Sequence, residues 1–229
     1  MISSGVSQYT GEFGYPEAKH LLNRALFGAK HSEIETCAAK TLDEVVEDLL
    51  DDSEQTLHFP LVNSDADAEE PVALGKTWIN EDTDKNNGNR RDSLYTWQFG
   101  EWLEQKVTLR EKMGLFFFNH MPVQSNVYSG LGLYRYHEFF KDNYMGNLKE
   151  IVKHVCVDYA MLRFLNGYEN VASQPNENFA RELLELFTIG KGPQVGEGDY
   201  THYTEEDVKA TAKVMTGWGV NWAQATSNF

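Results

Sequence analysis

Apolar residues recur along most of the chain at the three- and four-residue spacing of amphipathic helices. This spacing predicts a first helix between Pro16 and Gly28, because proline is favoured in the first turn of a helix and glycine just after its end. The tetrapeptides SEIE at 32–35 and TLDE at 41–44 match the capping box that starts a helix. They predict two further helices.

The middle of the chain differs in composition from the segments on either side. Residues 51–92 hold few apolar residues and many Asp, Asn and Glu, and this composition predicts a long irregular surface loop or insertion. A helix is then expected from about Tyr95 to His120, where Pro122 disfavours helical geometry at the preceding residue. Two helices are expected over 133–166.

Three residues precede apolar segments of helical period and are predicted N-caps: Asn147, Asn176 and Thr204. The helices that follow Asn176 and Thr204 are joined by a glycine-rich loop, so we expect them to pack together. Since no segment shows the strict alternation of a strand, the predicted fold class is mainly α. We expect an irregular multi-helix bundle with long loops, in one helical domain over residues 1–229. The residues expected at the helix contact are Leu183, Leu186 or Phe187 on one side and Val208 and Met215 on the other.

The net charge of the chain argues against some classes of binding partner. The 229 residues include 35 Asp and Glu against 20 Lys and Arg, which gives a net charge of −15. Neutralising phosphates takes clustered cations, so this charge argues against a nucleic-acid partner and against adhesion to anionic membranes. No apolar run approaches the roughly 20 residues of a membrane span. The start, MISSGVSQYTGEF, shows no signal peptide, which indicates a cytoplasmic protein or a processed form.

The segment PNENFARELLELF carries the densest polar cluster. On a helix, Asn178, Glu182 and Glu185 fall on one ridge with Arg181 beside it. The structural interpretation is an ordinary amphipathic helix, in which Arg181 pairs with Glu177 or Glu185. The functional interpretation needs the ridge to face a cleft, where Glu182 would meet a residue of another helix.

His120 is the residue most suited to complete such a site. It falls on the same face as Met113 and Phe117 of the preceding helix, at the carboxyl end. In the structural interpretation it is a core histidine that is held by a backbone carbonyl or favoured by the helix dipole. In the functional interpretation it faces Glu182 or Glu185 and forms a unit that binds a metal or moves protons.

A second candidate metal site lies in the polar segment. The stretch DTDKNNG offers Asp82, Asp84 and Asn86 as oxygen ligands for Ca²⁺. It fails as an EF-hand loop, because Asn87 and Ser93 occupy the positions that require Gly and Glu. The chain also lacks the sequence motifs of a phosphate loop, a zinc protease or a serine hydrolase, so the cofactor is unknown.

Five stretches resemble one family. The segments LREKMGLFFFNHM, NENFARELLELFTIGKG and YTEEDVKATAKVMTGWG, with HLLNRALFGAKHSEI and TLDEVVEDLL near the start, resemble the DUF1800 family of bacterial proteins of unknown function. The resemblance covers nearly all of residues 17–219. It implies a mainly helical, exported protein and a longer family domain, of which these 229 residues would be the N-terminal half.

The resemblance also bears on partners and on the site. Members of the family often occur beside a second family that resembles sulfatases and phosphatases, which implies another envelope protein as the partner. They commonly carry His-Asn-His where this chain has Phe118-Asn119-His120. If two histidines bound a metal there, this chain lacks one of them.

Two functions remain open. One is a hydrolase-type or metal-dependent enzyme acting outside the cytoplasm, with His120, Glu182 and Glu185 as catalytic residues. The other is a non-catalytic structural or binding protein of the cell surface or envelope. Candidate binding residues beside the catalytic set are Asn119, Asn178 and Arg181. The missing first histidine and the structural role available to each glutamate favour the second function.

Overall fold

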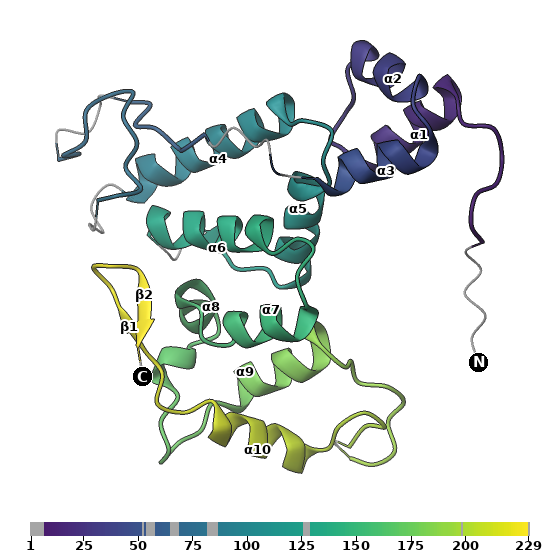
Figure 1. Cartoon of the computed structure of the whole chain (residues 1–229). Helices are drawn as coiled ribbons and strands as arrows, with labels where there is room; N and C mark the ends of the chain where they lie inside the picture. The colour runs from purple at the N-terminus through teal and green to yellow at the C-terminus, as the bar shows by residue number, and fades with distance from the viewer. Residues whose placement is uncertain are drawn as a thin grey trace. The chain divides into compact units, whose positions relative to one another are not determined.

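The computed structural model describes residues 7–51, 53, 58–64, 69–81, 87–125, 129–197 and 199–228. This part of the chain is mainly α, as predicted, with one antiparallel two-stranded sheet (Figure 1). The α-helices are α1 (Tyr15–Ala25), α2 (His31–Ala38), α3 (Leu42–Leu50), α4 (Asn87–Glu104), α5 (Arg110–His120), α6 (Gly130–Asp142), α7 (Leu148–Val155), α8 (Tyr159–Phe164), α9 (Glu177–Glu182) and α10 (Glu205–Val214). The other elements are the 3₁₀ helix η2 (Gly167–Glu169), the π-helix η3 (Leu183–Phe187) and the strands β1 (Gly219–Asn221) and β2 (Thr226–Asn228).

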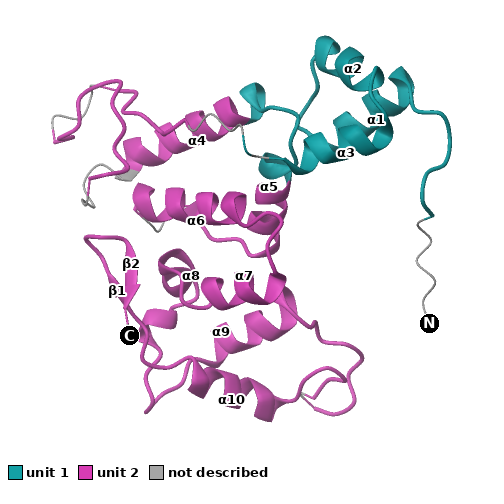
Figure 2. Ribbon diagram, in the orientation of Figure 1, with its two compact units in different colours: residues 1–56, 102–112 teal, residues 57–101, 113–229 magenta. Residues whose placement is uncertain are grey.

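The chain divides into two compact units (Figure 2). The first comprises Met1–Thr56 and Trp102–Lys112, and the second comprises Leu57–Glu101 and Met113–Phe229. The single helical domain expected over residues 1–229 stays a prediction.

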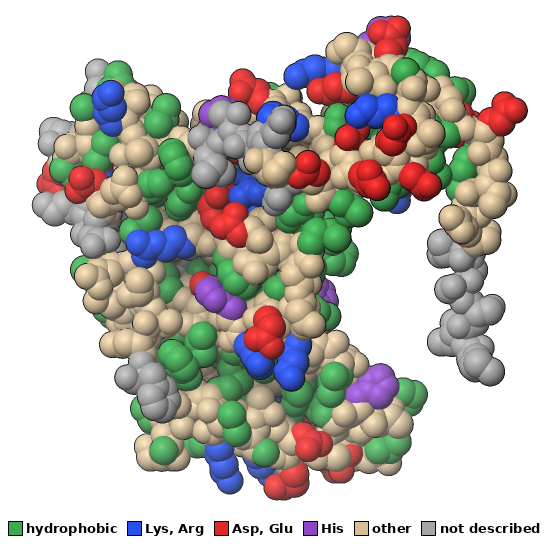
Figure 3. All heavy atoms as spheres, viewed as in Figure 1, with side chains coloured by type: hydrophobic (Ala, Val, Ile, Leu, Met, Phe, Trp, Pro, Cys, Tyr) green, Lys and Arg blue, Asp and Glu red, His purple; other side chains and the backbone are tan. Residues whose placement is uncertain are grey.

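The first unit is built on α1, α2 and α3. Leu22 and Val45 are fully buried in its core, and Asp and Glu side chains gather over these helices (Figure 3). Thr41 caps α3 in a capping box with Glu44, as the TLDE pattern predicted. The SEIE pattern misplaced the start of α2, which begins at His31.

The helix expected from Tyr95 to His120 is interrupted. α4 ends at Glu104 and α5 begins at Arg110. Between them the backbone N–H of Leu109 donates to the carbonyl of Leu49 at 2.8 Å. A backbone donor used in this tertiary bond is lost to the helical ladder, which explains why one helix becomes two.

The core of the second unit forms around aromatic residues of α6. Tyr136 and Phe140 are fully buried, and the Tyr136 hydroxyl donates to the carbonyl of Met121 at 2.7 Å. The β1–β2 hairpin lies beside α8, where the Arg163 guanidinium stacks 4.3 Å from the ring centre of Trp222 (Figure 1). The hairpin therefore packs on α8 through a cation–π contact.

The predicted loop over 51–92 needs two corrections. α4 begins at Asn87, so the irregular segment ends earlier than the composition suggested. Its described part is also not merely a solvated loop, because Trp78 is fully buried and its indole N–H donates to Ser93 of α4 at 2.7 Å. A single large aromatic residue thus anchors a polar segment to the core.

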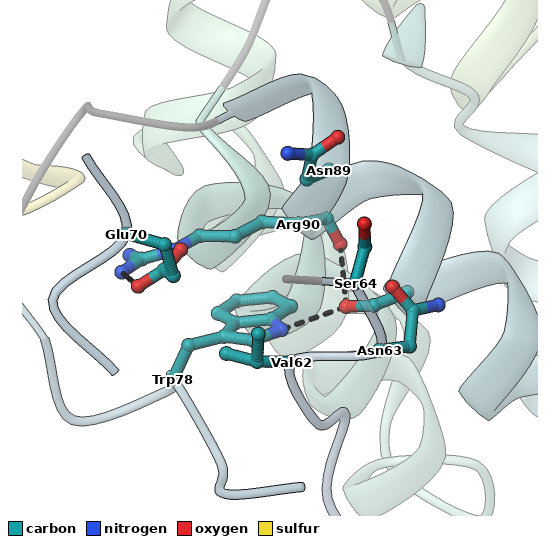
Figure 4. Close-up of a pocket in the computed structure, with 8 residues that line it drawn as sticks. Val62, Asn63, Ser64, Glu70, Trp78, Asn89 and Arg90 are labelled. Carbon is teal, nitrogen blue, oxygen red and sulfur yellow. Dashed lines mark hydrogen bonds and ion pairs between the residues drawn. The ribbon is translucent and has the colours of Figure 1, made fainter. Parts of the chain in front are cut away.

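A buried ion pair reinforces this anchor. Arg90 extends across the ring of Trp78 and makes two hydrogen bonds to the Glu70 carboxylate, at 2.7 and 2.9 Å (Figure 4). The Arg90 and Glu70 side chains are only 1% and 5% exposed. The cavity beside them measures about 10 Å³, which leaves room for nothing larger than one water molecule. We therefore assign this cluster a structural role.

We predict that Glu70→Gln lowers the free energy of unfolding by about 3 kcal/mol, because it removes the carboxylate charge that makes two hydrogen bonds to the buried Arg90 guanidinium. Urea denaturation followed by circular dichroism measures the loss. Glu150→Gln is the matched control, since Glu150 forms an exposed pair with Lys153 and should cost under about 1 kcal/mol. Equal losses in the two variants would contradict the structural role of the buried pair.

Candidate functional site

The ridge of Asn178, Glu182 and Glu185 lies on an α-helix that changes into a π-helix. α9 continues directly into the π-helix η3, an arrangement that is uncommon and frequent at functional sites. The wide turn is held by the Thr188 hydroxyl, which donates to the carbonyl of Leu183 at 2.7 Å. Gly190, at φ +70°, closes the helix by donating its N–H to the carbonyl of Leu184.

Two histidines bind the carboxyl end of this helix. His120 Nε2 lies 2.9 Å from the carbonyl oxygen of Phe187, and His202 Nδ1 lies 2.9 Å from that of Ile189. A carbonyl only accepts hydrogen bonds, so each of these nitrogens carries its proton. Donors at a helix carboxyl end are also favoured by the helix dipole. His120 is thus held by a backbone carbonyl, as the structural interpretation expected, but it is exposed and not a core residue.

The glutamates of the ridge have other neighbours than His120. Glu185 pairs with Lys191 at 2.8 Å and accepts a hydrogen bond from the Tyr203 hydroxyl at 3.1 Å. The Lys191 ammonium is the main cause that holds the pKa of Glu185 below its usual value. Within the described residues Glu182 makes no hydrogen bond or ion pair, contrary to the contact expected with another helix. The described residues therefore do not form the carboxylate–imidazole unit of the functional interpretation.

Arg181 has a different partner from the predicted ones. Its guanidinium forms two hydrogen bonds to the Glu205 carboxylate, at 2.5 and 2.9 Å, rather than pairing with Glu177 or Glu185. This bond raises the pKa of Arg181 further above its usual value. Two parallel bonds in a fixed geometry outweigh a single exposed pair along the same helix, which is why the neighbouring helix supplies the partner.

The other predicted site residues do not complete a site. Asn119 and Asn178 are exposed and make no hydrogen bond to any described residue. The calcium candidates Asp82, Asp84 and Asn86 lie outside the described residues. Over the ranges that the structure describes, no group of three or more His, Cys, Asp or Glu side chains is placed to hold a metal ion.

The position beside His120 is apolar in this chain. Phe118 stacks on His137 with ring centres 4.1 Å apart. Burial lowers the pKa of His137 to about 3, so this imidazole is neutral at physiological pH. Phe118 and His137 thus form an aromatic stack and not a charged pair.

The two helices of the predicted contact do pack together. α9 and α10 meet through Ala180 and Leu184 on one side and Val208 and Ala212 on the other. The pairing and the role of Val208 are confirmed. The other expected residues were wrong, since Leu183, Phe187 and Met215 pack in the main core and Leu186 is exposed. Alanine at the contact allows the close approach.

A buried amide ties this corner together. Asn170 is 2% exposed, donates to the carbonyl of Ala212 at 3.0 Å and accepts from the backbone N–H of Asn176 at 2.7 Å. Asn176 in turn caps α9 by accepting from the N–H of Phe179, and Thr204 caps α10, as predicted. The polar residues of both helix starts therefore have structural partners.

A pocket lies elsewhere in the second unit. It measures about 430 Å³ and is bounded by α6, by the turn between α7 and α8 and by the β1–β2 hairpin. Arg135, Glu138, Phe139 and Asp142 line it from one face of α6, where their spacing repeats the helical turn. Pockets of a few hundred Å³ are the usual size of small-molecule sites.

The opposite wall brings together an imidazole and a carboxylate. His154, at the end of α7, stacks on Phe139 with ring centres 3.7 Å apart. Its Nε2 lies 3.4 Å from the Asp158 carboxylate, which also caps α8 by accepting from the N–H of Ala160. Ser227 of β2 completes the wall.

Sequence reasoning missed this pocket. The only signal for it was the spacing of Arg135, Glu138 and Asp142, which is also that of an exposed helix face. His154 and Ser227 are far away in the sequence, and nothing local relates them to α6.

Comparison with known proteins identifies the family of the chain. The model described as "Protein of unknown function (DUF1800)" matches residues 20–229. The chain belongs to the DUF1800 family. No curated protein and no solved structure matches the chain. In this DUF1800 protein the two later signature segments form the corner of α9, η3 and α10, whereas the pocket lies between α6, α8 and the hairpin.

We predict that Glu185→Gln lowers the stability of this DUF1800 protein at pH 7 by up to about 1 kcal/mol, since the charged partner of Lys191 is lost. The pKa of Glu185 is depressed in the folded state, so its contribution is present above the unfolded pKa and disappears as the pH falls through the folded pKa. Urea denaturation over a series of pH values from 7 downward should therefore show a difference that is largest at pH 7 and shrinks as the pH falls.

Glu182→Gln is the control on the same helix, because Glu182 has no hydrogen-bond or ion-pair partner among the described residues. It should match the wild type throughout the pH series. A loss in Glu182→Gln as large as in Glu185→Gln would contradict the assigned contacts.

Proposed function

We propose that this DUF1800 protein is a non-catalytic binding protein of the cell envelope, and that the 430 Å³ pocket of its second unit is the binding site. One observation carries the proposal. The pocket combines apolar and aromatic walls with a few charged groups, which is the composition of small-molecule sites.

The contacts of the signature segments support a non-catalytic role. His120 donates to a backbone carbonyl, while Glu185 and Arg181 are engaged by Lys191 and Glu205. Hydrogen-bond reach between an acid and a base is the first requirement of general acid–base catalysis. The alternative function is a hydrolase-type or metal-dependent enzyme built on His120, Glu182 and Glu185. Among these described residues no hydrogen bond between an acid and a base supports it.

The envelope location and the partner rest on the family resemblance. We propose that the protein is exported and that its partner is an envelope protein of the sulfatase- or phosphatase-like family. The acidic charge agrees with a protein partner better than with nucleic acid. Within the described residues, none of the helices combines the length and the apolar character needed to cross a bilayer.

We expect fractionation of the cells that make this protein to recover it with the envelope or periplasmic fraction. An antibody against the purified chain detects it, and a cytoplasmic enzyme and a periplasmic protein serve as markers. Recovery with the cytoplasmic marker alone would refute the proposed location.

The binding role is tested with three aromatic probes of equal size: 4-fluorobenzylamine, 4-fluorobenzyl alcohol and 4-fluorobenzoate. We expect at least one of them to bind the wild type, with line broadening and a shift in ¹⁹F NMR. Thr226→Trp should weaken that binding by about tenfold or more, because an indole added to the wall fills the pocket. Thr226 is exposed on β2, where a large aromatic residue suits a strand.

Glu182→Gln is the matched control, since it lies outside the pocket and should leave binding unchanged. Absence of binding by all three probes, or equal binding by wild type and Thr226→Trp, would refute the pocket as the site. Loss of binding in Glu182→Gln would instead favour the signature segment.

A further inference from the structure

The hairpin wall of the pocket carries a hydroxyl on its inward face. Ser227 of β2 lies opposite Val220 of β1, so the two side chains are on the same face of the hairpin. Val220 packs against the main core, and Ser227 is half-buried and lines the pocket. The Ser227 hydroxyl makes no hydrogen bond to any described residue. Because polar groups on an inward face are normally hydrogen-bonded, this hydroxyl is suited to a ligand.

Arg135 brings hydrogen-bond donors to the α6 wall. Its Nη1 donates to the carbonyls of Gln224 and Ala225, at 2.5 and 3.3 Å, and so ties α6 to the turn of the hairpin. A guanidinium has several N–H donors and no acceptor. The donors of Arg135 other than Nη1 bond to no residue in the described ranges. The same side chain can therefore hold the wall and donate to a ligand.

Asp158 brings acceptors to the opposite wall. One carboxylate oxygen accepts from the N–H of Ala160, and the other lies 3.4 Å from His154 Nε2. A carboxylate has several lone pairs on its two oxygens, so it can accept from a ligand as well. The pocket thus combines a group that only donates, the Arg135 guanidinium, with a group that only accepts.

The same pocket has aromatic and hydrocarbon surface. Phe139 and His154 stack with ring centres 3.7 Å apart, and both line the pocket together with Val157 and Tyr159. A ligand that buries C–H groups against this surface gains free energy from their removal from water. The faces of aromatic rings carry partial negative charge, which attracts C–H groups of partial positive charge.

We propose that the pocket binds a neutral polyhydroxylated molecule, a sugar or a cyclic polyol, with hydroxyls on Arg135, Asp158 and Ser227 and its C–H face on the aromatic wall. The inference rests on the proposed binding function of the same pocket. A hydroxyl both donates and accepts, so it serves a guanidinium, a carboxylate and a serine alike. A carboxylate ligand has no proton to donate to Asp158, and an ammonium ligand has no lone pair for Arg135. A hydroxyl also serves His154 in either protonation state.

Saturation-transfer difference NMR titrations of the wild-type protein test the ligand class. The neutral probes are the methyl pyranosides of glucose, galactose and mannose. Each is compared with its 6-amino-6-deoxy analogue, an ammonium, and with its uronate, a carboxylate. Cyclohexanol supplies the ring with a single hydroxyl. We expect at least one neutral pyranoside to bind, and to bind more tightly than its two charged analogues and than cyclohexanol.

The variant Ser227→Ala tests the residue. It should weaken the neutral pyranoside about fivefold, the loss expected for one hydrogen bond. Ser173→Ala is the matched control, because Ser173 is an exposed serine of the same unit that does not line the pocket. It should leave binding unchanged. Both variants should melt like the wild type, since neither hydroxyl has a partner among the described residues.

The outcomes separate the two proposals. If no neutral pyranoside exceeds its charged analogues and cyclohexanol, while an aromatic probe binds and Thr226→Trp weakens it, the sugar proposal is overturned and the binding pocket stands. If Ser227→Ala binds the pyranoside as the wild type does, or Ser173→Ala weakens it equally, the hairpin hydroxyl does not hold the sugar and the proposal is likewise overturned. If neither the sugars nor the aromatic probes bind, both proposals fail.

Discussion

One buried amide links the two signature segments near the carboxyl end of this protein. Asn170 donates to the carbonyl of Ala212 in α10 and accepts from the N–H of Asn176, the cap of α9. Removing that side chain would leave two buried backbone groups without partners, at a cost of about 1–3 kcal/mol each. The close contact of α9 with α10, and hence the Arg181–Glu205 pair, depends on this link.

That contact explains why several polar residues of the signature segments have structural partners among the described residues. A helix that ends in a π-turn exposes carbonyls, and His120 and His202 satisfy two of them. Glu185 on the same helix pairs with Lys191 and accepts a hydrogen bond from Tyr203. Imidazole and carboxylate groups are common in catalytic sites. Here each of them stabilises the carboxyl end or the side of one helix. We therefore propose the pocket beside α6 as the binding site.

The pocket has a different origin. It exists because the β1–β2 hairpin packs beside α8 and is tied to α6 by Arg135. Local rules that start and stop helices do not include such contacts. In the same way, the ring of Trp78 and the Arg90–Glu70 pair fix a polar segment that composition alone assigns to solvent.

The sequence by itself determined the mainly helical class, the family and the starts of α3, α7, α9 and α10. These follow from local causes, because a cap at Thr41, Asn147, Asn176 or Thr204 bonds a backbone N–H two or three residues away. Only the tertiary structure decided the break between α4 and α5, the partners of His120, Glu185 and Arg181, and the existence of the pocket. Each depends on a group that is distant in sequence, such as Leu49, Phe187, Glu205 or Ser227. The energy of such contacts depends on burial and geometry. The spacing of residues along one helix carries no information about either.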